Sequence, residues 1–152
     1  MKNIILRDTT KRKEQHCLDR NPFEMIEKIQ THAELDEEES SFLRELKKKH
    51  SSYKSQDKLH HKFDDEKHIT LNELVDKLVD CKLLCYYCNQ QVSLLYNQKK
   101  DPKQWTLERL NNNLGHYNTN TCIACLKCNL GRRTENHEYY KKGKTMILKK
   151  GI

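Results

Sequence analysis

The sequence has few of the residues that interrupt regular structure: its 152 residues include only 4 Gly and 2 Pro. That composition excludes a collagen-like chain and a low-complexity linker. Apolar residues are also scarce, since hydrophobic residues make up 35% of the chain and charged residues 34%. Little apolar material is therefore available for a core of this size. We expect one domain with at most an added arm, stabilised in part by a bound metal ion.

Long apolar runs are absent, and the opening residues MKNIILRDTTKRKEQ contain only three consecutive apolar ones. We therefore expect neither a signal peptide nor a transmembrane helix, and no membrane as a partner. The seven cysteines are an odd number. In a reducing compartment, paired Cys-x-x-Cys motifs indicate a metal far more often than a disulfide. We expect an intracellular protein of the cytoplasm or nucleus.

Acidic residues are scarce in the second half of the chain. Residues 81–152 contain 13 Lys/Arg and 4 Asp/Glu, a net charge of +9, whereas residues 1–80 contain 16 and 18, a net charge of −2. A basic half is typical of proteins that bind a phosphate backbone. A basic tail that only aids solubility is the alternative, but here the basic residues flank the cysteine motifs. The expected partner is DNA or, alternatively, RNA.

Apolar periodicity predicts three helices in the first half. They cover residues 22–31, opened by a proline, residues 40–50, whose flanking charges match the helix dipole, and residues 71–80. The last begins with a capping box formed by Thr70 and Glu73. Residues 51–67 are polar without a clear period, and we interpret them as an extended arm. The final residues TMILKKGI are expected to form a short strand or a loose end.

Two Cys-x-x-Cys motifs form the strongest signal in the sequence: Cys85 with Cys88, and Cys125 with Cys128, with 36 residues between them. Two such turns complete a closed, tetrahedral, structural zinc site with four thiolate ligands. Cys81 and Cys122 lie close enough in sequence to be alternative ligands, although each is better explained as a small buried residue. Cys17 remains as a free thiol.

The segment between and after the motifs alternates in the manner of strands. It predicts a short strand at residues 92–96, a turn at 97–103, a strand at 105–110, a loop at 111–120 and a second strand at 121–124. A helix should follow from residue 125 or 126, with Asn129, Arg132 and Arg133 on its exposed side. The fold class is α+β: a helical or extended N-terminal region (1–69), a zinc-bearing domain (70–140) and a basic tail (141–152).

Several spaced elements of this segment together resemble the HNH, or ββα-metal, endonucleases, in the zinc-bearing branch found in phages and large DNA viruses. The pattern is C-x-x-C, then W-(T/S)-L-(D/E)-R-(I/L)-(D/N)-N-x-x-G-H, an Asn, and C-x-x-C-N-x-x-R-R. It is carried here by Cys85, Cys88, residues 105–112 (WTLERLNN), Gly115, His116, Asn120 and residues 125–133 (CLKCNLGRR). The resemblance covers about a third of the chain and implies a protein encoded by a virus or phage.

The resemblance implies a hairpin and helix that hold one divalent ion, Mg²⁺ or Mn²⁺, beside the scissile phosphate. By position, Glu108 is the acidic metal ligand and Asn129 the ligand on the helix. Asn120 is the asparagine that orients the general base. A carboxylate with an amide oxygen suits a hard cation that keeps most of its waters.

The sequence departs from the family at the general-base position, where Arg109 replaces the usual histidine and cannot accept a proton at neutral pH. Three alternatives remain. His116, in the following loop, supplies the base; Arg109 clamps the phosphate while metal-bound water or Tyr117 attacks; or the domain is inactive and only binds.

The expected function is therefore a metal-dependent DNA endonuclease. The rivals are a non-catalytic zinc-ribbon protein that binds nucleic acid, and an interaction module whose acidic half recruits a protein. The oligomeric state, monomer or homodimer, stays open. The residues expected along the phosphates are Lys127, Arg132, Arg133, Lys141 and Lys142.

Overall fold

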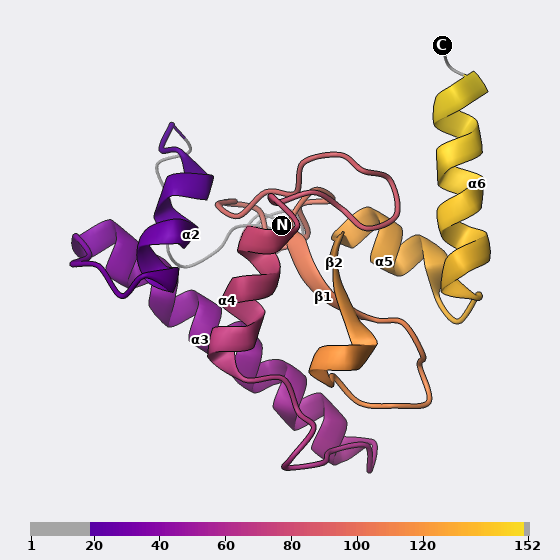
Figure 1. The fold of residues 1–152 in the computed structure, drawn as a ribbon, viewed down its shortest axis with the longest axis horizontal. Helices are drawn as coiled ribbons and strands as arrows, with labels where there is room; N and C mark the ends of the chain where they lie inside the picture. The colour runs from indigo at the N-terminus through magenta and orange to yellow at the C-terminus, as the bar shows by residue number, and fades with distance from the viewer. Residues whose placement is uncertain (1–18, 151–152) are drawn as a thin grey trace, which may run out of the picture.

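Five helices surround a two-stranded antiparallel sheet in the computed structural model, which describes residues 19–150 (Figure 1). In chain order the elements are α2 (Pro22–Gln30), α3 (Glu37–Leu59), α4 (Leu71–Asp80), β1 (Trp105–Arg109), the 3₁₀ turn η1 (Asn118–Asn120), β2 (Thr121–Cys125), α5 (Leu126–Arg132) and α6 (His137–Lys150). The fold is of the α+β class, as predicted.

Helices α2 and α4 are close to the predicted ones and pack against each other. The side chain of Asn21 accepts hydrogen bonds from the first backbone N–H groups of α2, and Met25, Ile26 and Ile29 form its buried face. The capping box of α4 is confirmed in both directions, because Thr70 and Glu73 each accept the other's backbone N–H. These two helices cover one end of the core.

Helix α3 is much longer than predicted, with 23 residues. The extended arm predicted at 51–67 is therefore wrong for residues 51–59, which are helical. The reason is a buried stripe that continues along one face at helical spacing and ends in polar residues: Phe42, Leu46, Tyr53 and Asp57. The polar residues on this face conceal the apolar period. The stripe brings the C-terminal end of α3 against β1, where the hydroxyl of Tyr53 accepts the Leu107 N–H at 3.0 Å.

The strands predicted at 105–110 and 121–124 are confirmed as β1 and β2, which pair antiparallel from Trp105 opposite Cys125 to Arg109 opposite Thr121. The strand predicted at 92–96 is wrong. Its apolar side chains are buried, but its backbone forms only an isolated bridge, between Ser93 and Gln104. The segment is therefore held in place by the burial of its apolar side chains in the core, and it has no continuous partner strand.

The C-terminal part differs from the prediction in its last residues. Helix α6 crosses the boundary placed at 140/141 and continues to Lys150, so the expectation of a strand or loose end is wrong for residues 145–150; residues 151–152 lie outside the described part of the chain. It stands on the side of the hairpin away from α2 and α3 (Figure 1). Tyr140 anchors it with an edge-on contact to Tyr87, the ring centroids being 5.0 Å apart.

The predicted boundary at 69/70 also separates segments that pack together, since α3 contacts β1 through Tyr53.

None of the helices within residues 19–150 combines the length and the apolar character needed to cross a bilayer.

Candidate functional site

The predicted cysteine ligands come together in one cluster. The four Sγ atoms of Cys85, Cys88, Cys125 and Cys128 all lie within 4.8 Å of one another. Zinc bonded to four thiolates at about 2.3 Å separates the sulfurs by about 3.8 Å, and the Sγ atoms of Cys88 and Cys125 are 3.9 Å apart. The cluster is therefore able to hold a metal ion, and its geometry is consistent with structural zinc.

Local backbone turns position each pair of thiols. Cys85 and Cys88 lie on a turn closed by the hydrogen bond from the Asn89 N–H to the Cys85 carbonyl at 3.0 Å. Cys125 ends β2 and Cys128 lies in the first turn of α5. The hydrogen bond between the two thiols lowers the pKa of Cys85 and raises that of Cys125. Zinc binds each cysteine as the thiolate.

The two alternative ligands lie outside the cluster. Cys81 is the C-terminal cap of α4, and its thiol donates to the Leu78 carbonyl at 3.4 Å. Cys122 is half-buried within β2. Burial raises the pKa of both thiols. Cys17 lies outside the described residues.

A second site is a polar cavity of about 270 Å³ between α3, β1, the loop after β1 and α5. Four of the predicted active-site residues line it together: Glu108, Arg109, His116 and Asn129. The remaining lining residues are Tyr53, Gln56, Leu107, Asn112, Leu130 and Arg133. Side chains that are up to 80 positions apart in the sequence thus face one space.

Glu108 is 5% exposed, and one oxygen of its carboxylate contacts two buried residues. Its Oε2 accepts from the Tyr87 hydroxyl at 3.4 Å and lies 3.6 Å from Nη1 of Arg132. Burial raises the pKa of the Glu108 carboxyl, and the Arg132 guanidinium opposes that rise.

Asn129 is oriented by a hydrogen bond from its Nδ2 to the Thr106 hydroxyl at 3.0 Å. Because the amide nitrogen is used there, the amide oxygen is the atom left for a ligand. Thr106 and Glu108 are two positions apart and therefore lie on the same face of β1. The strand thus carries the hydroxyl that orients Asn129 and, next to it on that face, the Glu108 carboxylate.

His116 is 4% exposed and its ring is bonded to a residue outside the predicted site. Nδ1 lies 2.7 Å from Oδ1 of Asp57, and the backbone N–H of His116 donates to Oδ2 at 2.6 Å. The ring of Tyr53 covers it, with centroids 4.8 Å apart. No described residue bonds Nε2. Burial lowers the pKa of His116, whereas the bond to Asp57 raises it, and burial prevails.

Asn120 does not orient His116 directly, which corrects that prediction. Its amide bonds the backbone of Asn111 through both atoms and donates to the Gly115 carbonyl at 3.0 Å. Its role is to close the loop that carries His116. Arg109 is tied to the same loop, because Nη1 donates to the carbonyls of Asn112 and Leu114.

Four of the five residues expected along the phosphates are exposed: Lys127, Arg133, Lys141 and Lys142. The expectation is wrong for Arg132, which is 3% exposed. Its guanidinium donates to the Arg109, Leu110 and Glu135 carbonyls. It therefore ties the end of α5 to the end of β1.

Arg133 adopts a positive φ of 54° directly after α5, a conformation that costs about 1–3 kcal/mol for a non-glycine residue. Its carbonyl accepts from Nδ2 of Asn112 at 3.1 Å. The unusual backbone places an arginine at the edge of the cavity.

Three residues that contact this site are not among the predicted site residues: Asp57, Tyr53 and Tyr87. Asp57 and Tyr53 lie four positions apart on the buried stripe of α3. That spacing was the available signal, but it requires the helix to be known first.

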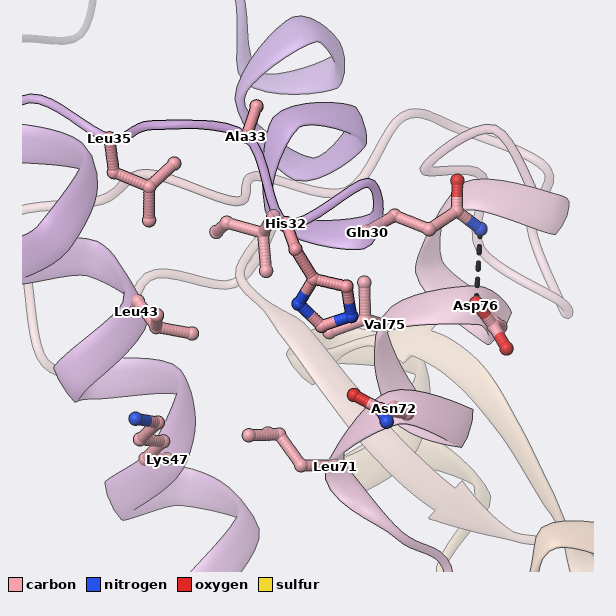
Figure 2. A pocket seen from close by; sticks show the side chains of 11 residues that line it. Gln30, His32, Ala33, Leu35, Leu43, Lys47, Leu71, Asn72, Val75 and Asp76 are labelled. Atoms are coloured by element: carbon pink, nitrogen blue, oxygen red, sulfur yellow. Dashed lines mark hydrogen bonds between the residues drawn. The ribbon is translucent and has the colours of Figure 1, made fainter.

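A cavity of about 570 Å³ lies elsewhere, between α2, α3 and α4. Figure 2 shows His32 extending into it, with apolar side chains of α3 and α4 around it and Gln30 bonded to Asp76. Its lining combines no metal-binding or acid–base cluster. The smaller cavity is therefore the candidate active site.

Comparisons with protein-family models, with curated proteins and with solved structures find nothing that matches this chain.

Proposed function

We propose that the chain is a metal-dependent endonuclease of the HNH type that hydrolyses phosphodiester bonds in DNA. The observation that carries the proposal is the cavity lined jointly by Glu108, Arg109, His116 and Asn129. A carboxylate, an amide oxygen, a histidine and an arginine are the groups that such hydrolysis needs in one place. The proposed structural ion of the cysteine cluster is zinc.

The catalytic ion would be Mg²⁺ or Mn²⁺, held by the carboxylate of Glu108 and the amide oxygen of Asn129. Both are oxygen donors, and the few protein ligands suit a hard cation that keeps several waters. The ion would supply charge stabilisation for the phosphate and the leaving oxygen.

His116 is the proposed general base, and Nε2 is the atom that acts. It accepts a proton from the attacking water as the water oxygen bonds to phosphorus. The bond from phosphorus to the leaving oxygen then breaks, and that oxygen takes a proton from solvent. Burial keeps the pKa of His116 below its usual value, so the ring is neutral and able to accept a proton at pH 7. Arg109 and Arg133 contribute positive charge for the phosphate.

The test is incubation of the full zinc-loaded chain with supercoiled plasmid and Mg²⁺ or Mn²⁺. We expect nicking that requires the added ion and is lost in Asn129→Ala, which removes one proposed ligand. Nicking by the wild type at or below the level of Asn129→Ala would contradict the proposal.

A second candidate, a non-catalytic zinc protein that binds nucleic acid, is favoured by Glu108. Burial raises its pKa, and Oε2 is already engaged by Tyr87 and Arg132, which weakens it as a metal ligand. This alternative predicts that plasmid is bound, with a strong dependence on salt, and is not nicked.

A further inference from the structure

We propose that Asp57 is a positioning residue for His116, which it fixes in the tautomer with hydrogen on Nδ1 and the Nε2 lone pair toward the cavity. Asp57 belongs to α3, outside the segment that carries the sequence motif. The catalytic consequence rests on the proposed function, but the tautomer itself does not.

The first support is that both oxygens of Asp57 bond the same residue. Oδ1 lies 2.7 Å from Nδ1 of His116, and Oδ2 accepts the backbone N–H of His116 at 2.6 Å. The side chain of Asp57 is 1% exposed. A buried carboxylate has to be hydrogen-bonded, and as an anion it only accepts. Nδ1 is therefore the donor, and a neutral ring then carries its lone pair on Nε2.

The second support is Gly115, the residue before His116. A Cβ there would lie 2.7 Å from Oδ2 of Asp57 and 2.4 Å from the Lys62 carbonyl. The φ angle of Gly115 is negative, so the glycine is required by the close approach and not by backbone freedom. Only glycine lets the carboxylate reach the backbone of His116. The glycine, the histidine and Asp57 thus form one fitted unit.

The third support is the enclosure of the pair. Tyr53 covers the ring of His116, and His68 lies on the other side of the carboxylate, with Nδ1 3.5 Å from Oδ2 but without hydrogen-bond geometry. A charge this deeply buried is screened little. Asp57 therefore stabilises the imidazolium that forms when His116 accepts a proton, as the buried aspartate does in a serine-protease triad.

The groups that act electrostatically on the pair come from several elements. Arg109 of β1 and His68 both lower the pKa of His116, against the effect of Asp57. His50 and Lys54 of α3 act on His68. Removal of the Asp57 charge should therefore lower the pKa of His116 further.

The direct test is ¹⁵N NMR of the histidine rings in the full zinc-loaded chain, with His116 assigned by comparison with His116→Gln. We expect a pyrrole-type shift for Nδ1 and a pyridine-type shift for Nε2 near pH 7. In Asp57→Asn, whose amide can donate to Nδ1, the tautomer should change to Nε2–H. Hydrogen on Nε2 of the wild type, or a mixture of tautomers, would overturn the proposal.

A second test measures plasmid nicking by the same variant, Asp57→Asn. Asp57→Asn should lower kcat by about 10²- to 10⁴-fold, the usual contribution of acid–base catalysis, with KM unchanged. The acid limb of the pH–rate profile of the residual activity should move to lower pH. Asp65→Asn, in an exposed turn, is the matched control and should behave as wild type. An unchanged kcat and acid limb in Asp57→Asn would overturn the positioning role.

The two proposals fail separately. If the wild type does not nick plasmid with either ion, the nuclease assignment fails while the ¹⁵N shifts still decide on Asp57. If Asp57→Asn does not fold, the wild-type tautomer gives the same decision.

Discussion

The cysteine cluster and the polar cavity are two sites built in opposite ways. The cluster takes its four ligands from two short turns, so each pair is placed by a few residues of local backbone. The cavity takes its side chains from α3, β1, a loop and α5, and it exists only when these elements pack. We therefore expect the cluster to depend on a bound metal ion and the cavity to depend on long-range contacts.

The largest expected effect breaks the cluster. In Cys125→Ser one thiolate is lost, and we expect the chain to lose zinc and with it most of the stability of the hairpin end. Structural zinc contributes about 10–16 kcal/mol in small metal-dependent domains. The measurement is zinc content per chain by elemental analysis, together with thermal unfolding with and without EDTA.

Cys81→Ala is the matched control, because Cys81 is not one of the four clustered cysteines. It should retain the zinc of the wild type. A Cys125→Ser chain that keeps its zinc and its melting temperature would refute the four-cysteine site.

The next largest effect is on the free energy of unfolding, and it compares the buried Arg132 with the exposed Arg133 at the cavity. Arg132→Met leaves the buried carboxylate of Glu108 without its cation and several carbonyls without a donor. Loss of one partner of a buried pair costs about 3–5 kcal/mol. Urea unfolding of the zinc-loaded chain measures the change in the free energy of unfolding.

Arg133→Met is the neighbouring control, since Arg133 is exposed. Exposed substitutions usually change stability by about 0.5 kcal/mol or less. Equal destabilisation by the two variants would show that Arg132 does not hold the cavity together.

A smaller effect concerns two exposed basic residues of α6. Lys141→Gln and Lys142→Gln should each weaken DNA binding and reduce the slope of log K against log salt by about 1, because each would remove one of the phosphate contacts that the proposed function requires. Titrations of a labelled duplex at several salt concentrations measure the slope. Lys48→Gln, an exposed charge on α3, should leave it unchanged; the same loss in all three variants would indicate only a net-charge effect.

The smallest effect is the pH dependence of stability that buried histidines impose. Burial lowers the pKa of His68 in the folded state, so as the pH falls below about 6.5 the unfolded chain binds the proton first. The free energy of unfolding therefore decreases with falling pH, by at most about 1.4 kcal/mol per pH unit for one histidine.

Urea unfolding at pH 7.5 and 5.5 in the wild type and in His68→Gln isolates this contribution, since both chains have the same four-cysteine cluster. The variant should lose less stability on acidification. A variant with the full pH dependence of the wild type would show that His68 is not the group responsible.

The same contrast explains how much the sequence could predict. The two Cys-x-x-Cys turns and the capping box at Thr70 are local features; the gathering of the four cysteines and the capping box are both confirmed. The long α3 was missed because its buried stripe ends in the polar residue Asp57. The burial of Arg132 could not be predicted for a related reason. Arg132 and Arg133 are adjacent and identical, so the sequence does not indicate which of the two side chains is buried. Roles that depend on distant packing were not predictable from local pattern.

The central claim, that the cavity hydrolyses phosphodiesters with His116 as the base, is tested most directly by the single-turnover rate of His116→Ala. The assay is plasmid nicking by the zinc-loaded chain with saturating Mg²⁺. Loss of a general base predicts a rate about 10²- to 10⁴-fold below that of the wild type. An unchanged rate would contradict the assignment of His116.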